Sequence, residues 1–111
     1  REIIKNLIKG KSIALMIDQR VREGEKVKFF NNLATTTTIP AQLVKKYKCE
    51  LVPIYIERKK SNYFKIYISK PIKVSKTKSI LEITEFLNQV LENMILKNVD
   101  QWIWTHDRWK S

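Results

Sequence analysis

Residues 98–110 read NVDQWIWTHDRWK and contain all three tryptophans and the only histidine of this 111-residue chain. Tryptophan is costly at a polar chain end unless it packs or binds something. On a helix Trp102 and Trp109 would lie close together while Trp104 points well away. On a strand Trp102 and Trp104 would share a face. The tail must therefore bend or be sandwiched, and we expect it to fold back onto a sheet or onto the helix that precedes it.

The preceding helix is predicted over residues 80–97. Ser79-Ile80-Leu81-Glu82 matches a capping box, which marks the helix start. The apolar residues that follow recur at helical spacing and form one stripe, as expected for core packing. The stripe comprises Ile80, Ile83, Leu87, Val90, Leu91, Met94 and Ile95.

Upstream, the pattern predicts alternating helix and strand. A short helix over residues 3–8 ends at Gly10, and residues 12–17 form an apolar run of strand length. This run predicts a buried strand that needs neighbours on both sides, so the chain should expose apolar surface and aggregate or bind hydrophobic dyes. Residues 18–32 are polar and rich in charge, which predicts a long loop.

The middle of the chain predicts a helix followed by a hairpin. Pro40 suits the first turn of a helix over residues 41–47, and Thr38 is a candidate N-cap. Residues 51–57 and 63–68 alternate in polarity and predict two strands that pair across a turn at residues 58–61. The predicted fold class is therefore α/β, with a partial mixed sheet flanked by helices.

The chain carries 22 Lys and Arg against 11 Asp and Glu, a formal net charge of +11. Such a surplus favours polyanionic partners, including nucleic acid, anionic lipid headgroups, phosphorylated sugars and acidic proteins. The clusters at 45–48, 58–60 and 70–78 are by default solvated faces. The single Cys49 cannot form an internal disulfide, which favours a reducing compartment. No apolar run approaches the roughly 20 residues of a membrane span.

Four groups between residues 18 and 38 point to ligand binding. Asp18 and Gln19 open the loop, Arg20 and Arg22 suit bidentate phosphate contacts, and Asp18 could orient either arginine. Phe29 and Phe30 offer an apolar wall suited to an acyl tail. The run of Thr35 to Thr38, with Thr36 and Thr37 as candidate ligands, enters a helix N-terminus, where hydroxyls and free amides favour anions. An equally weighted alternative is that the phenylalanines are core, the arginines are solvated and the threonines only cap.

Several of these blocks, in this order, resemble the late acyltransferases of lipid A biosynthesis, the lauroyl/myristoyl-transferase family. The tail residues Gln101, Trp102, Trp104, His106, Arg108, Trp109 and Lys110 match the family's C-terminal signature. Asp18-Gln19-Arg20, Phe29-Phe30 with Asn31, Ala34 to Thr38, and Val52-Pro53 resemble its middle blocks. Asn31 stands where the family has Gly, and Asn is the residue that next best tolerates a positive φ.

The resemblance implies that residues 1–111 form a single segment, the C-terminal half of a glycerolipid-acyltransferase-like domain. It implies transfer of a fatty acyl group from acyl carrier protein to a hydroxyl of a phosphorylated lipid A precursor. It places this reaction at the cytoplasmic face of the bacterial inner membrane and requires no cofactor and no nucleic acid. The alternative from another class is a non-enzymatic basic module that binds nucleic acid or an anionic membrane surface, since aromatics among cations can stack on bases.

The family's His-x-x-x-x-Asp/Glu dyad, which supplies the general base, is absent, because Ser111 stands five residues after His106. We therefore expect no catalytic residue in this segment, no activity of the segment alone, and a structural role for His106. The sequence has no cluster of Cys and His residues, so it predicts no metal site. Arg108 is expected to pair with a carboxylate or a ligand phosphate, so Arg108→Ala in the full-length enzyme should cost activity more than stability. Trp104→Ala should cost roughly 3–5 kcal/mol if Trp104 is buried.

Overall fold

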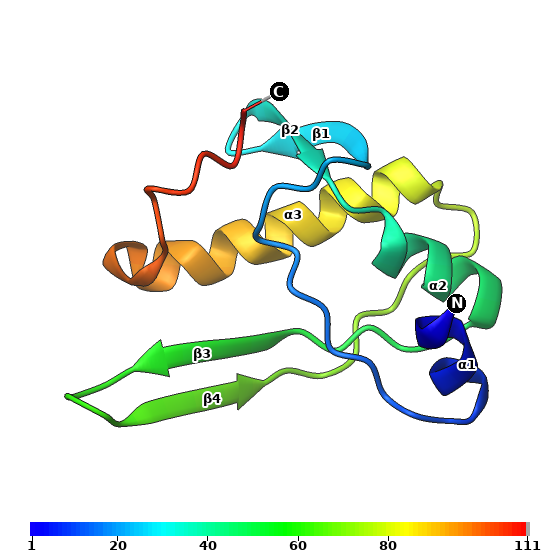
Figure 1. The fold of residues 1–111 in the computed structure, drawn as a ribbon, viewed down its shortest axis with the longest axis horizontal. Coiled ribbons are helices and arrows are strands. Elements are labelled where there is room, and N and C mark those ends of the chain that lie inside the picture. The colour runs from blue at the N-terminus through cyan, green and yellow to red at the C-terminus, as the bar shows by residue number, and fades with distance from the viewer. Residues whose placement is uncertain (111) are drawn as a thin grey trace.

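The structure is a computed structural model and describes residues 1–110 (Figure 1). Two antiparallel hairpins lie on opposite sides of one long helix. The second of the two shorter helices packs against this long helix. The elements are α1 (Glu2–Ile8), β1 (Glu25–Phe29), β2 (Asn32–Thr36), α2 (Ile39–Tyr47), β3 (Ile54–Arg58), β4 (Phe64–Ile68), α3 (Ile80–Lys97) and the 3₁₀ turn η1 (Val99–Gln101). The α/β class is confirmed, and the strands form two separate two-stranded sheets.

Helix α3 begins and ends where the sequence predicted. The Ser79 side chain accepts a hydrogen bond from the Glu82 backbone N–H, and the Glu82 carboxylate accepts one from the Ser79 backbone N–H, so both halves of the capping box are present. Ile83, Leu87 and Ile95 of the predicted stripe are buried. The helix is the surface against which β1 and α2 pack.

Hairpin β1–β2 was not predicted, so the expectation of a loop throughout residues 18–32 is wrong. Val27 and Phe29 of β1 are buried, and the two strands meet at a two-residue turn in which Phe30 and Asn31 have φ of 49° and 64°. Such a left-handed pair matches the twist of a tight hairpin. Asn31 thus adopts the positive φ for which the sequence marked it, while the alternation of Val27 and Phe29 with lysines was the missed signal.

Residues 12–17 do not form the predicted buried strand. The segment has no regular secondary structure and no ladder pairing to any described residue, and Leu15 and Met16 are 40% and 73% exposed. A strand of this apolar character is stable only with hydrogen-bonding neighbours on its edges. With none among residues 1–110, the backbone stays irregular and the apolar surface expected from the sequence is exposed.

The two short helices match their predictions closely. Helix α1 ends just before Gly10, which has φ of 79° and so takes the left-handed conformation of a helix stop. Helix α2 has Thr38 at the N-cap position and Pro40 in its first turn, although the Thr38 side chain makes no capping bond. The Thr37 hydroxyl instead accepts from the Ile39 N–H at 3.3 Å.

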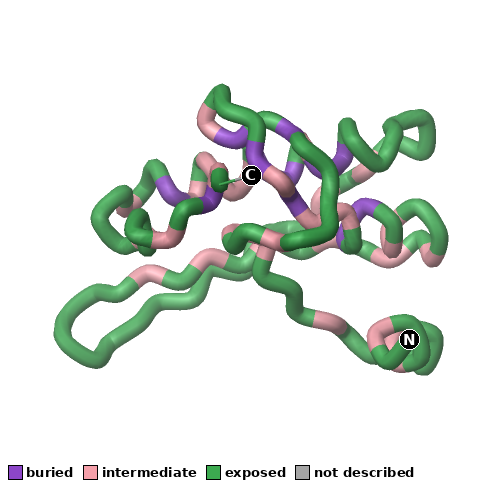
Figure 2. The backbone as a smooth tube through the Cα atoms, turned by 45° about the horizontal axis from the view of Figure 1, so that its top comes forward, coloured by how far each residue is buried: buried purple, intermediate pink, exposed green. Residues whose placement is uncertain are grey.

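Hairpin β3–β4 confirms the predicted pair of strands, with Ile56 opposite Ile66 and Tyr55 opposite Tyr67. The first strand starts at Ile54, three residues later than predicted, because residues 51–53 contribute only one isolated bridge. Figure 2 shows this hairpin as an arm with exposed backbone along most of its length. Within residues 1–110 no helix is long and apolar enough to cross a membrane.

Candidate functional site

The tail folds back onto hairpin β1–β2 and α3, as the sequence predicted. The ring of Phe29 is fully buried; Trp109 stacks on it at 5.4 Å between centroids, and Trp102 meets it edge-on at 5.8 Å. The Trp109 indole N–H donates to the Phe29 carbonyl at 3.0 Å. Ala34 and Ile95 complete this core cluster. Phe29 therefore anchors the tail.

Trp104 lies outside this core. Its side chain is 47% exposed and meets the edge of Trp102, and its indole N–H donates to the Val99 carbonyl at 2.6 Å. The loss of roughly 3–5 kcal/mol predicted for Trp104→Ala required a buried Trp104, and this requirement is not met.

Arg108 is the most deeply buried charge in the described chain, with 0% exposure. Its guanidinium donates to the Thr35 carbonyl and to the Thr36 hydroxyl, each at 2.8 Å, and lies over the Phe29 ring at 5.3 Å. Burial lowers the pKa of Arg108, while the charge of Asp18 raises it. The predicted carboxylate or phosphate partner is thus replaced by threonine oxygens, because the tail carries the guanidinium inside the fold.

The hydroxyl of Thr36 is at the centre of a buried polar network. It donates to the Ala34 carbonyl at 3.0 Å and accepts from Arg108 and from the Asn88 amide, the latter at 3.2 Å. The same amide donates to the Lys28 carbonyl at 3.1 Å, which ties α3 to β1. Thr36 thus has its hydrogen-bonding capacity filled inside the protein.

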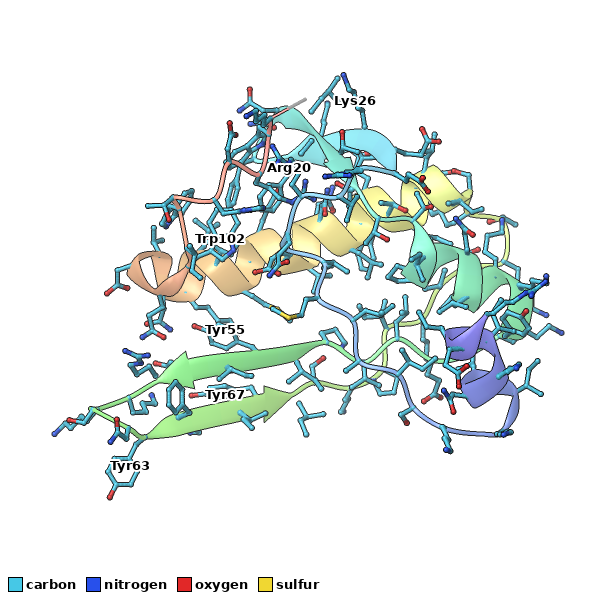
Figure 3. The ribbon with its side chains drawn as sticks, viewed as in Figure 1. Arg20, Lys26, Tyr55, Tyr63, Tyr67 and Trp102 are labelled. Atoms are coloured by element: carbon cyan, nitrogen blue, oxygen red, sulfur yellow. The ribbon has the colours of Figure 1, made fainter. Side chains whose placement is uncertain are left out.

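His106 joins the tail to the loop at residues 18–24. Two arginines in this loop are balanced by Asp18 and Glu23, and we call it the basic loop after Arg20 and Arg22. Its Nε2 accepts a hydrogen bond from the Arg20 backbone N–H at 3.0 Å, across 86 positions of sequence. A hydrogen bond between His106 and the backbone was expected from the sequence and is present, while its structural rather than catalytic role stays a prediction. Figure 3 labels Arg20, which lies beside the tail.

The charges of the basic loop remain available to a ligand. Arg20 and Arg22 are exposed and form no ion pair with any described residue, and Gln19 is exposed beside them. The half-buried Asp18 pairs with neither arginine; its charge acts on Arg108 instead. Substrate binding by these residues stays a prediction.

The remaining predicted residues lie at separate places. Phe30 is half-buried at the β1–β2 turn, and its N–H donates to the Glu92 carboxylate at 2.6 Å. Thr37 lies at the start of α2. Gln101 pairs with β3: its amide oxygen accepts from the Arg58 N–H at 2.9 Å, and its amide nitrogen donates to the Arg58 carbonyl at 3.0 Å. The tail motif therefore touches both hairpins.

Three residues that position the site were missed. Asn88 and Glu92 are one turn apart on α3, where polar residues beside an apolar stripe were the available signal. Gly24 ends the basic loop against β2, where a Cβ atom would lie 2.2 Å from the Thr36 carbonyl oxygen. Only glycine allows this close approach. In the described part of the chain no group of three or more metal-ligating side chains comes together.

Comparison with known families supports the resemblance that the sequence motifs indicated. The family model for bacterial lipid A biosynthesis acyltransferases matches residues 1–111, the whole chain. The chain therefore belongs to the bacterial lipid A biosynthesis acyltransferase family, as its motifs suggested. Membership relates it to acyl transfer in lipid A biosynthesis, with a lipid A precursor and an acyl donor as the general substrates. A comparison with curated proteins gave no significant match.

Proposed function

We propose that this chain is the C-terminal half of an acyltransferase that moves a fatty acyl group from acyl carrier protein to a hydroxyl of a phosphorylated lipid A precursor. The reaction takes place at the cytoplasmic face of the inner membrane of a Gram-negative bacterium. The acceptor oxygen forms an ester bond with the acyl carbon, the carbon–sulfur bond of the thioester breaks, and the hydroxyl proton passes to a general base. This chain contributes headgroup binding and packing, and the base comes from a His-x-x-x-x-Asp/Glu pair outside these residues.

The observation that carries the proposal is the hydrogen bond from the Arg20 N–H to His106. It joins the two segments that resemble the family most closely and holds the basic loop against the tail. Arg20 and Arg22 then present guanidiniums without an ion-pair partner among the described residues. Two such groups on one fixed loop suit the phosphates of the acceptor.

The same hydrogen bond supports the inactivity of this segment alone. His106 is the only histidine, and its Nε2 lone pair is occupied by the Arg20 N–H. A general base needs that lone pair for the acceptor hydroxyl. Without a base the attack loses on the order of 10²- to 10⁴-fold in rate.

The test measures acceptor binding and acyl transfer separately, with the 111-residue chain in detergent micelles. A radiolabelled, phosphorylated lipid A precursor is the acceptor and a fatty acyl thioester of acyl carrier protein is the donor. We expect acceptor binding without transfer. Arg20→Gln/Arg22→Gln should weaken binding roughly tenfold, while the matched control Lys26→Gln/Lys28→Gln, which removes two exposed charges from β1, should not.

Three results would contradict the proposal. Acyl transfer by the chain itself, abolished in His106→Ala, would show that a base is present and that His106 provides it. Equal loss of acceptor binding in both double variants would show that only net charge matters. Retention of RNA on filters with an affinity above that for the acceptor would favour the nucleic-acid-binding alternative.

A further inference from the structure

Hairpin β3–β4 has two faces of opposite character. Tyr55 and Tyr67 point toward α3, where the Tyr55 hydroxyl accepts from the Asn98 amide and the Lys97 ammonium lies 5.4 Å from the Tyr55 ring centre. Figure 3 shows Tyr55 between β3 and α3. The opposite face, which we call the outer face, carries large apolar side chains that are each 51–70% exposed. These side chains are Ile54, Ile56, Phe64, Ile66 and Ile68.

The outer face is contiguous rather than scattered. In the ladder Ile54 is opposite Ile68, Ile56 is opposite Ile66, and Phe64 is opposite Arg58, so three neighbouring cross-strand pairs present one surface. Soluble proteins seldom expose apolar surface of this continuity unless it contacts something. No described residue covers it.

The charge around the outer face indicates what the partner is. Residues 52–73 contain six cationic side chains, all exposed, and a single carboxylate. Of these, Lys65 lies on the inner side, opposite Glu57 and 4.9 Å from the Tyr67 ring centre, and Lys59 pairs with Glu57. The cations that remain around the outer face are Arg58, Lys60, Lys70 and Lys73. The carboxylate, Glu57, points to the inner side, where Lys59 at 3.2 Å and the Tyr67 hydroxyl lower its pKa. A second copy of the chain docked on this face would bring like charges together, which is unfavourable.

We propose that the outer face of β3–β4 lies on the surface of an anionic lipid bilayer, with its apolar side chains in the interfacial region and its cations on the lipid phosphates. An apolar face with a cationic rim is the arrangement that binds anionic interfaces. At the tip Tyr63 is 76% exposed and points away from the protein body (Figure 3), and aromatic rings of this kind favour the headgroup level. This inference deepens the proposed function, because it names the surface that contacts the membrane.

The test is cosedimentation of the 111-residue chain with vesicles of phosphatidylglycerol and phosphatidylcholine, beside vesicles of phosphatidylcholine alone. We expect binding to the anionic vesicles that weakens with salt. Lys60→Gln/Lys70→Gln should weaken it roughly 10- to 30-fold. The matched control Lys5→Gln/Lys9→Gln removes two exposed charges from the α1 region and should have little effect.

A second pair of variants tests the apolar contribution. Ile56→Ser/Ile66→Ser removes an exposed cross-strand pair and should weaken binding tenfold or more, which corresponds to about 1.4 kcal/mol. Leu33→Ser/Leu96→Ser is the control, since these leucines are 59% and 60% exposed and lie outside the hairpin. Circular dichroism melting of each variant separates a lost contact from a lost fold.

Three results would overturn the inference. One is equal weakening by the hairpin variants and their controls. Another is a dimer in sedimentation velocity that Ile56→Ser/Ile66→Ser dissociates, which would make the outer face a protein interface. The third is equal binding to neutral and anionic vesicles. None of these measurements involves the lipid A precursor or acyl transfer, so a result in micelles that contradicts the proposed function would leave this inference standing.

Discussion

Arg108→Met tests whether the buried guanidinium holds the tail in place. Methionine fills much of the same space but donates no hydrogen bonds, so the Thr35 carbonyl loses its 2.8 Å partner and the Thr36 hydroxyl loses one of three. Each hydrogen bond from a charged donor contributes about 1.5–3 kcal/mol. Part of that loss is offset, because burying the charge is itself costly. We expect a net decrease of roughly 2–3 kcal/mol in the free energy of unfolding.

Urea unfolding followed by tryptophan fluorescence measures this decrease, because Trp102 and Trp109 pack on the ring under the guanidinium. The midpoint should fall without a large change in slope, and the melting temperature should fall by roughly 8–12 °C for a chain of this size. Arg22→Met is the control, since Arg22 is exposed and its change should stay within about 0.5 kcal/mol. If Arg108→Met were as stable as the parent chain, the guanidinium would contribute no net stability. This expectation replaces the sequence-based one, which placed the cost in activity.

Four further substitutions test other contacts of the fold and the site. Trp109→Ala should lower stability by roughly 2–4 kcal/mol and Trp104→Ala by about 1 kcal/mol, and chemical denaturation would contradict the packing if the order were reversed. The pKa of Glu82 is lowered from 4.5, mainly by the backbone N–H at the N-cap of α3, so its stabilisation is complete above about pH 4.5 and disappears as the pH falls through the lowered pKa. Glu82→Gln should flatten the pH dependence of the melting temperature between about pH 6 and pH 3; an unchanged profile would exclude this role. His106→Phe should speed hydrogen exchange at the Arg20 amide roughly fivefold, and unchanged exchange would show that the bond is not formed in solution.

Short sequence patterns predicted the helices and turns whose stabilising contacts lie close together in the sequence. The capping box and the apolar stripe fixed both ends of α3, because the hydrogen bonds and contacts that define them lie within a few residues. The turn between β3 and β4 was predicted for the same reason. The prediction of a strand at residues 12–17 was wrong because strand formation there depends on neighbouring strands. An apolar run alone does not indicate whether such partners are present.

The site was predicted in parts, and its connections were not. The tail motif and the basic loop were identified from residue types, but the hydrogen bond between Arg20 and His106 spans 86 positions and leaves no local pattern. The sequence left Phe29 and Thr36 open between ligand contact and a structural role, because aromatic and hydroxyl side chains serve both. Their burial in hairpin β1–β2, which the loop prediction had missed, favours the structural alternative.

The arrangement of the tail also explains why a histidine in an acyltransferase segment need not be the base. Arg108 and Trp109 fix the end of the tail on β1 and β2, and this fixed position carries His106 to the basic loop. If Nε2 accepted a proton it would become a donor, and the Arg20 N–H would lose its acceptor. Proton transfer at this atom would therefore release the loop that we propose holds the acceptor headgroup. A base at His106 would work against headgroup binding, whereas a base on another segment would leave the loop in place through every turnover.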